Sequence, residues 1–288
     1  MNAELKQQLL QQQLFFSSFQ SNLSDSPLWQ SNKTCQGIFH DIHHELRLHK
    51  SDEATRSAAL LARFEAARRE APGIMDKYTR DVIRTTTPSI PYSQTGTSGT
   101  DQFTFLSSVF VCKIPRATLH EVFLATIDQF TSLTQQLAHH ADMQLTSTPI
   151  CSFGESLHYS QLEYQSGVFA GVRSNVTFQA EFLSDKLAIM VIDFVEADEL
   201  YPHETSENSL RKDGVSMFTL TPVVDELTGQ NCILLRRLLV HRYNLLSNSS
   251  RLHNEVNSMA TYLNGDLPMA MICQALQANS ARPAPKSD

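Results

Sequence analysis

The segment HDIHHELRLH, residues 40–49, gathers the histidines and carboxylates that most readily hold a metal ion. A zinc-protease helix carries the pattern H-E-x-x-H, which places two histidines four residues apart on one helix face. Here His44-Glu45 is followed by His49, five residues after His44. That spacing puts the second histidine about 140° round a helix from the first. The protease pattern is therefore missed by one residue.

A second histidine pair in this segment has the helical spacing that a metal site needs. His40 and His44 stand at i and i+4, with Asp41 in the position of the acid. A catalytic metal also needs a third ligand and an open position, and the sequence selects neither Glu65 nor Glu70 as that ligand. We favour an ordinary helix with one solvated side, and expect neither metal nor cofactor. Its packing stripe would be Phe39, Ile42, Leu46 and His49.

Length and composition predict one substantial domain with appendages. The 288 residues are 41% hydrophobic and carry a net charge of −7. Nucleic-acid binders usually show a dense stripe of Lys and Arg, and the sequence has none, so we expect no direct nucleic-acid binding. The five cysteines are far apart and form no C-x-x-C pair, which argues against zinc ribbons and disulfide frameworks.

The sequence carries no signal for a membrane or for secretion. No apolar run approaches the roughly 18 residues of a membrane-spanning helix. The start of the chain, MNAELKQQLLQQQLFF, holds too many glutamines for the core of a signal peptide. We therefore expect an intracellular protein, cytoplasmic or nuclear, without a membrane span.

Residues 1–83 have helical periodicity and are predicted to form an all-α N-terminal extension. Residues 4–23 follow an a/d heptad spacing, which indicates either a short coiled coil that forms a homodimer or an amphipathic helix packed on its own domain. Further helices are expected over 33–50 and 54–70, the second ending at Ala71-Pro72-Gly73, and over 74–83. The heptad positions are Leu5, Leu9, Gln12, Phe16, Phe19 and Leu23.

Residues 84–100, RTTTPSIPYSQTGTSGT, are rich in turn-forming residues and predict a linker. From residue 101 to 278 the periodicity becomes mainly that of strands. The segment VFAGVRSNVTFQAEF, residues 168–182, alternates apolar and polar side chains, as a strand with one wet face does. Residues 279–288 are expected to be a disordered tail. The other strands are predicted over 103–112, 143–149, 155–164, 186–196, 215–223 and 231–243.

The order of these elements predicts an α+β domain. A strand is followed by a helix, six strands and a long C-terminal helix over residues 249–276. A curved antiparallel sheet of seven strands must bury its apolar face, and the last helix is the large element available to cover it. A sheet wrapped round one helix often leaves a gap that serves as a ligand cavity.

This order resembles the helix-grip fold of START and Bet v 1-like lipid-binding domains. The segments TPSIPYSQTGTSGTDQF, FLSSVFVCKIP and LLRRLLVHRYNLL further resemble a family of oomycete proteins that includes a mating-specific group. In that family a helical or zipper-like segment precedes a START-like domain. The resemblance covers residues 28–277 and implies a pocket for a sterol, phospholipid or other apolar ligand. It transfers no site residue, because START-like domains have no fixed ligand-binding motif.

We predict non-enzymatic binding of a lipid or another apolar small molecule, with a possible regulatory role. The alternative is a ligand-free interaction or transcription-associated protein that dimerises through its N-terminal helix. Asp193, inside an apolar strand, is a candidate to pair within the pocket with Arg236 or Arg237, which face opposite sides of their strand. We favour the alternative, a structural ion pair or a strand that faces solvent. The candidate pocket residues are Val176, Phe178, Met190, Ile192, Asp193, Met217, Arg237, His241, Met259 and Leu263. A solid core built from the same residues is the simpler possibility.

Overall fold

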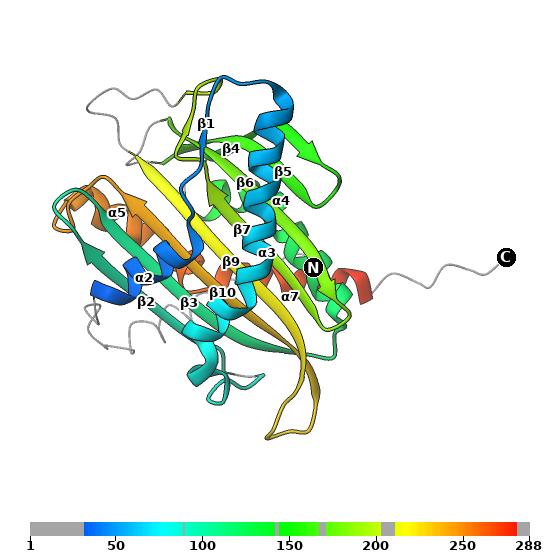
Figure 1. Cartoon of the computed structure of the whole chain (residues 1–288). Helices are drawn as coiled ribbons and strands as arrows, with labels where there is room; N and C mark the ends of the chain where they lie inside the picture. Colours follow the sequence, from blue (N-terminus) through cyan, green and yellow to red (C-terminus); the bar gives the residue numbers. More distant parts are fainter. Residues whose placement is uncertain (1–31, 89, 142–143, 167–170, 203–210, 281–288) are drawn as a thin grey trace.

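The centre of the molecule is an eight-stranded antiparallel sheet with helices on both faces (Figure 1). The computed structural model describes residues 32–88, 90–141, 144–166, 171–202 and 211–280. The strand order is β2-β3-β10-β9-β7-β6-β5-β4. The strands are β2 (Tyr92–Gly99), β3 (Thr104–Pro115), β4 (Gln144–Phe153), β5 (Leu157–Gln165), β6 (Val172–Ser184), β7 (Leu187–Phe194), β9 (Lys212–Val224) and β10 (Asn231–Tyr243).

Two groups of helices cover the two faces of this sheet. The first group is α2 (Asn32–Ile42) and α3 (Glu53–Ile83), and in Figure 1 α3 crosses in front of the strands. We call the face that they cover the α3 face. A short parallel pair, β1 (Arg47–Leu48) with β8 (Ala197–Asp198), lies outside the main sheet. The opposite face, called the cavity face below, packs against α4 (Leu119–Ala141), α5 (Ser250–Ser258), α6 (Ala260–Leu263) and α7 (Asp266–Ser280).

The alternation of side chains along β10 supplies apolar groups to both faces. Leu238 and Val240 belong to the buried cluster that includes α2 and α3 side chains. Leu235 and Leu239 belong to the clusters of the C-terminal helices. β10 pairs with β3 on one edge and with β9 on the other, and the helices on the two sides of the sheet bury both of its faces. This explains its nearly continuous apolar sequence.

Helix α3 is longer than the sequence predicts. It begins at the N-cap Asp52, whose Oδ1 accepts a hydrogen bond from the Thr55 amide at 2.9 Å. The helix then passes through Pro72, where we expected a stop. Ala71 and Met75 are fully buried against the sheet on either side of this proline. Their packing holds the helix together although proline removes one backbone hydrogen bond.

The sheet has eight strands where the sequence predicts seven, because part of the expected linker 84–100 is a strand. β2 pairs antiparallel with β3 from Tyr92 opposite Val111 to Gly99 opposite Thr104. β2 is an edge strand and most of its side chains are not buried, so it needs no alternating apolar pattern. β2 forms because it pairs with β3, and the composition of β2 alone does not predict a strand.

The expected long C-terminal helix is three shorter helices. The break before α7 is at Gly265, which has a φ of 91°. A side chain at this position would also collide with the ring of Phe110. Glycine is therefore required both by the backbone conformation and by the close approach to β3. α5 and α6 can consequently turn across the end of the sheet while α7 packs beside α4.

Residues 32–83, expected as part of a separate helical extension, are integrated into the main core. α2 and α3 contribute buried side chains to a cluster that also holds residues from β3, β7, β9 and β10. The predicted coiled-coil positions of residues 4–23 lie outside the described residues. So do residues 281–288 of the predicted tail 279–288, whose first two residues instead belong to α7. Within the described part of the chain, no helix has the length and apolar character needed to cross a membrane.

Candidate ligand-binding cavity

A cavity of about 550 Å³ lies between the cavity face of the sheet and the helices α4 to α6. Most of its lining is apolar: Ile127, Phe130, Leu145, Leu162, Val172, Val176, Phe178, Ala180, Ile192, Val215, Leu239 and Met259. The other lining residues are Ser147, Glu155, His158, Ser160, Tyr164, Ser174, Lys212, Gly214, Ser216, His241 and Tyr262. The volume falls within the roughly 300–1,000 Å³ of ordinary ligand pockets.

The alternating pattern of β6 builds one wall of this cavity. Ser174, Val176, Phe178 and Ala180 all line the cavity, at every second position of the strand. These are the side chains that the sequence pattern places on one face. On α4, Ile127 and Phe130 line the cavity from the helix side. These two side chains form a wall of the cavity opposite the sheet.

A buried ion pair marks one end of the cavity. The ammonium group of Lys212 lies 2.8 Å from Oε1 of Glu255, and both side chains are buried. Glu255 also accepts a hydrogen bond of 2.6 Å from the Tyr164 hydroxyl and one of 3.1 Å from the Ser166 hydroxyl. Burial lowers the pKa of Lys212 from its usual value, although the charge of Glu255 opposes this effect. The pair joins β9 to α5 across the end of the cavity.

His241 adjoins this ion pair and is buried in its neutral form. Burial lowers the pKa of His241 well below the usual value, and the positive charges of Lys212 and Arg237 act in the same direction. Its Nδ1 lies 3.3 Å from the Tyr243 hydroxyl. The hydroxyl of Ser174, on β6, is also buried and has no hydrogen-bond partner within the described residues. Lys212, Tyr164 and His241 therefore form a group of polar residues in the cavity lining.

The side of the cavity near the β4–β5 turn is wetter. Glu155 lines it and is exposed, while His158 is half-buried. The His158 ring bonds locally, with Nδ1 3.0 Å from the Ser152 hydroxyl and Nε2 3.1 Å from the Glu155 carbonyl oxygen. Ser147 of β4 also lines the cavity and is exposed, so the cavity is open to solvent on the side of β4. The cavity thus has an open side and a buried polar end.

The candidate pocket residues fall into three groups. Val176, Phe178, Ile192, His241 and Met259 line the cavity. Two others, Met190 and Leu263, are buried in the adjoining apolar clusters of the same face. The remaining three, Arg237, Met217 and Asp193, do not line the cavity.

Arg237 is on the cavity face, but its guanidinium binds protein groups and does not line the cavity. Its guanidinium donates hydrogen bonds to the carbonyl oxygens of Tyr262, at 3.0 Å, and Leu263, at 2.6 Å, and to the Ser108 hydroxyl at 3.0 Å. These bonds satisfy carbonyl groups at the C-terminal end of α6. Met217, by contrast, packs into the cluster on the α3 face.

Asp193 also lies on the α3 face, and its partner is not the predicted Arg236 or Arg237. The Arg63 guanidinium of α3 donates a hydrogen bond of 3.0 Å from Nε to Oδ2 of Asp193. Nδ1 of His43, just after α2, lies 2.8 Å from Oδ1. Arg236 instead pairs with Asp76 of α3. The predicted charge pair within the pocket is therefore replaced by a buried pair beneath α3.

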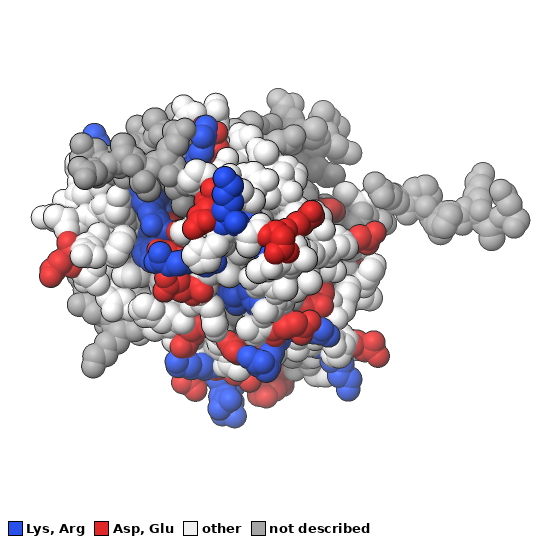
Figure 2. Space-filling view, turned by 45° about the horizontal axis from the view of Figure 1, so that its top comes forward, with Lys and Arg blue, Asp and Glu red and all other residues white. Residues whose placement is uncertain are grey.

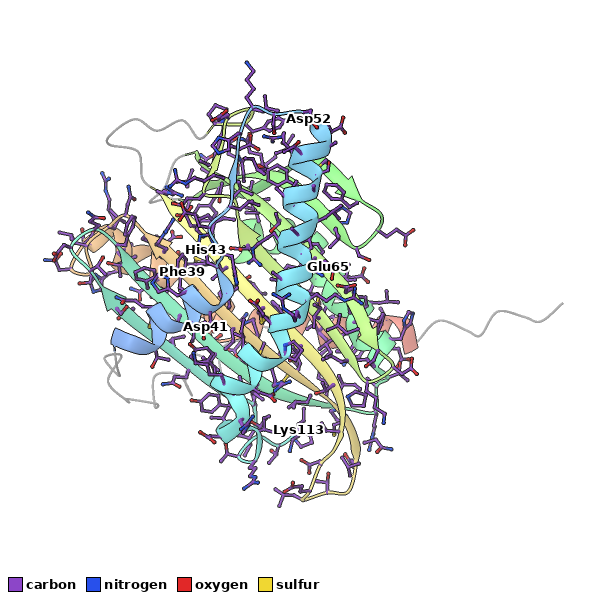
Figure 3. All side chains as sticks on the ribbon, in the orientation of Figure 1. Phe39, Asp41, His43, Asp52, Glu65 and Lys113 are labelled. Carbon is purple, nitrogen blue, oxygen red and sulfur yellow. The ribbon has the colours of Figure 1, made fainter. Side chains whose placement is uncertain are left out.

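His43 is a buried histidine of the histidine-rich segment, and the sequence interpretation did not single it out. Its ring stacks on Phe194, with centroids 4.0 Å apart, and lies beside Phe39 at the end of α2 (Figure 3). Burial alone lowers the pKa of His43, but the hydrogen bonds and charges of Asp193 and Glu196 raise it more, so the net pKa is above its usual value. A positive His43 is therefore stabilised under the N-terminal helices.

The predicted packing stripe of this segment is wrong at one end. α2 ends at Ile42, and residues 43–46 are extended, so His43 turns inward while the His49 side chain is 75% exposed. His44 pairs with Glu70 at 2.9 Å. Within the described residues, no group of three or more His, Cys, Asp or Glu side chains has the arrangement of a metal site.

Other charged groups extend the pair beneath α3 into a network. Arg242 of β10 lies 3.2 Å from Glu196 and 2.7 Å from Asp213, and it stacks over the rings of Phe39 and Phe194. The hydrogen bond from His43 lowers the pKa of Glu196 to about 2, helped by the charges of Arg242 and Arg211. On the face drawn in Figure 2, basic and acidic side chains are interspersed, and neither sign forms a patch.

Sequence reasoning missed the polar end of the cavity. Ser174 was placed correctly on the inward face of its strand, but Lys212 stood in a segment expected to be a loop. Lys212, Gly214 and Ser216 line the cavity at alternate positions of β9, and this period-two spacing was the available signal. Glu255 had no such signal, because its burial depends on where α5 lies against the sheet.

Comparisons with known proteins give fold-level likenesses only. No family model and no curated protein matches the sequence. Among solved structures, the chain is similar to human StAR-related lipid transfer protein 5, with a TM-score of 0.44 and 12% identity over 78% of this chain and 99% of that chain. It is similar to a STAR-related lipid transfer protein fragment from Xanthomonas axonopodis (TM-score 0.35, 11% identity, 65% and 99% covered). It is also similar to Ara h 8.0201 (TM-score 0.31, 11% identity, 60% and 99% covered). Because these TM-scores are below 0.5, the ligand and role of this chain are argued from the cavity itself.

Proposed function

We propose that this protein binds an apolar small molecule, such as a lipid, in the cavity between the sheet and α4 to α6. The observation that carries the proposal is the cavity of about 550 Å³ with a mostly apolar lining and a few polar groups at one end. Pockets that bind small molecules have this combination of size and lining. The resemblance of the sequence to START-like and Bet v 1-like domains implies the same class of ligand.

The space is larger than the packing of a protein core ordinarily leaves. Protein interiors are packed as densely as organic crystals, with few voids larger than a water molecule. Side chains that face an apolar void lose dispersion contacts, and the loss of stability grows with the volume of the void. An apolar ligand in contact with Phe130, Phe178 and Ile192 would restore those contacts.

Binding is favoured over catalysis by how the ionisable side chains of the cavity are paired. Lys212 and Glu255 neutralise each other, and Tyr164 donates its hydroxyl hydrogen to Glu255. Among the described residues, His241 is hydrogen-bonded to the phenol of Tyr243. His158 does lie beside the Ser152 hydroxyl, but this contact is exposed at the β4–β5 turn. A general acid or base with a nucleophile at its side is the arrangement that acyl or proton transfer would need.

Filling the cavity provides the test. The neutral dye prodan fluoresces more strongly in apolar surroundings, and we expect it to bind the full-length chain. Val176→Trp places an indole in the cavity and is expected to weaken the affinity for prodan at least tenfold. Val224→Trp makes the same change at a position that is 60% exposed and outside the cavity. It should leave the affinity unchanged.

Circular dichroism of both variants would establish that each is folded. A folded Val176→Trp variant that binds prodan as tightly as the wild type would refute the assignment of the ligand to this cavity. Absence of saturable binding by the wild-type chain would refute the proposed function as a whole.

A further inference from the structure

We propose that β2 is an interface at which two copies of this chain pair, strand to strand, into one continuous antiparallel sheet. The inference concerns the edge of the sheet and does not depend on the ligand of the cavity. It rests on the free hydrogen-bonding groups of β2, on the absence from β2 of the features that block an edge strand, and on a register in which the strand complements itself.

The turn between β2 and β3 fixes which backbone groups of β2 point away from the sheet. The amide of Thr100 donates a hydrogen bond of 2.7 Å to the carbonyl oxygen of Phe103, so these two residues are a hydrogen-bonded pair. In an antiparallel ladder, hydrogen-bonded and non-hydrogen-bonded pairs alternate along the strands. In the register of β2 with β3, the residues whose N–H and C=O groups point outward are therefore Ser93, Thr95, Thr97 and Gly99.

These outward groups form an open edge. β2 is the last strand of the sheet on the side of β3 (Figure 1), and among the described residues its backbone–backbone hydrogen bonds go to β3 alone. Helix α2 packs on the α3 face of β2, where the sulfur of Cys35 lies beside Gly96, and its backbone makes no hydrogen bond to the outward groups. A row of unpaired N–H and C=O groups is a template on which another strand can pair.

β2 also lacks the features by which proteins block an edge strand. Prolines, charged side chains and bulges on an edge prevent other strands from pairing with it. The opposite edge strand, β4, has a proline at Pro149 and a shift of register between Pro149 and Cys151. The sequence of β2, YSQTGTSG, contains no proline and no charged residue, and its register with β3 is unbroken. One edge of the sheet is thus blocked against pairing and the other is open to it.

A second copy of this chain is the partner that fits the open edge. In antiparallel pairing about a two-fold axis at Gly96, Thr95 lies opposite Thr97 of the second copy, and Ser93 lies opposite its Gly99. This register pairs all the outward residues, and each pair exchanges two backbone hydrogen bonds. Facing threonines are a favourable cross-strand pair. Because β2 carries no charge, the two strands meet without like-charge repulsion, although each chain has a net charge of −7.

The oligomeric state of the full-length chain tests the proposal. Sedimentation velocity over a range of micromolar concentrations should show an equilibrium between monomer and dimer. Thr95→Pro removes an outward N–H group that the chain itself does not use, and an edge strand tolerates proline at such a position. We expect this variant to stay folded, as measured by circular dichroism. It should dimerise at least tenfold more weakly, because two hydrogen bonds related by the two-fold axis are lost.

A charge on the same edge should act in the same direction. Thr97→Lys brings two ammonium groups together near the two-fold axis, and like charges on neighbouring strands are destabilising, so the affinity of the dimer should again fall. Gln144→Lys adds the same charge at an exposed position of the opposite edge strand β4 and should leave the dimer unchanged. Leu9→Lys places a charge in the heptad stripe of residues 4–23 and should also leave the dimer unchanged.

Amide hydrogen exchange locates the interface residue by residue. As the concentration of the wild-type chain rises, the exchange of the outward amides of Ser93, Thr95 and Thr97 should become slower. The amides of Gln94 and Gly96, which already face β3, should exchange at an unchanged rate.

A chain that stays monomeric at every concentration would overturn the inference. A dimer that survives both Thr95→Pro and Thr97→Lys would do the same, as would a dimer that Leu9→Lys dissociates, because the interface would then lie in residues 4–23. Slow exchange of the outward amides in a monomer would mean that another part of the chain covers the edge, and it too would overturn the inference. The affinity for prodan decides the proposed function separately from all these results.

Discussion

The two faces of the sheet bury charged side chains in different surroundings. On the α3 face, Asp193, Arg63 and His43 form a closed cluster against packed helices. On the cavity face, the Lys212–Glu255 pair stands at the end of a space of about 550 Å³. Both clusters are buried, but one adjoins packed aromatic rings and the other adjoins a cavity. The comparison teaches that a buried charge pair marks a binding site only when unfilled space lies beside it.

Removal of Asp193 should produce the largest effect and should be confined to stability. Asp193→Ala leaves the guanidinium of Arg63 and the ring of His43 buried without their carboxylate. We expect a loss of about 3–5 kcal/mol in the free energy of unfolding, measured by urea denaturation. The exposed turn residue Asp185 provides the control, because Asp185→Ala should cost less than about 0.5 kcal/mol.

A change of ligand affinity in Asp193→Ala would contradict the independence of the Asp193 cluster from the cavity. Asp193, Arg63 and His43 contribute no side chain to the lining of the cavity, although Val176 and Val215 of the adjoining apolar cluster do. The folded variant should therefore bind prodan with the affinity of the wild type, at a temperature where it is fully folded.

The pH dependence contributed by His241 should be the next largest effect. Because its folded pKa is well below the value of 6.5 expected when unfolded, its contribution to stability is present above pH 6.5 and is lost as the pH falls. Between pH 7.5 and pH 5.5 this linkage amounts to about 1 kcal/mol. Unfolding of His241→Gln by urea should lack this loss, so its stability deficit should shrink at pH 5.5. A deficit that grows toward pH 5.5 would contradict a neutral His241.

His43 should show a dependence of the opposite sign. Its folded pKa is raised by Asp193 and Glu196, so its contribution is present below the unfolded pKa and is lost as the pH rises through the folded pKa. The stability deficit of His43→Gln should therefore be larger at pH 5.5 than at pH 9. The titration of Glu196 does not interfere, because its pKa of about 2 and the usual value of 4.5 both lie below this range. Equal deficits at the two pH values would mean that folding does not raise the pKa of His43.

The smallest effect is expected at the outer end of the histidine-rich segment. His49 pairs with Glu199 at 2.9 Å, but the two side chains are 75% and 53% exposed. Exposed ion pairs contribute little to stability, because water and salt screen them. His49→Ala should leave the urea midpoint unchanged at pH 6, whereas His43→Gln should lower it. A clear loss from His49→Ala would remove the distinction between the buried and exposed histidines.

Sequence patterns predicted the elements whose burial is decided locally. The alternation of residues 172–182 predicted β6 and the direction of Ser174, Val176 and Phe178, because a strand with one apolar face has a period of two. The helix predicted after the first strand is α4, which carries Ile127 and Phe130 at the cavity.

Other features depend on partners far along the chain and had no local signal. β2 exists because β3 offers it a hydrogen-bonding edge, although its own sequence is polar. Arg236 and Arg237 were the candidate partners of Asp193, but its arginine is Arg63, from a helix 130 residues earlier. The position of Glu255 likewise depends on how α5 packs against the sheet. Packing decided these contacts, and no residue pattern encodes it on its own.

Native mass spectrometry of the gently purified full-length chain tests the central claim, that the cavity face holds an apolar ligand, most directly. The account predicts a species heavier than the chain by the mass of one small molecule. That molecule should pass into an organic extract and should be missing from the Val176→Trp variant. A chain that carries no added mass, yields nothing to the extract and takes up no lipid when lipids are offered would contradict the account.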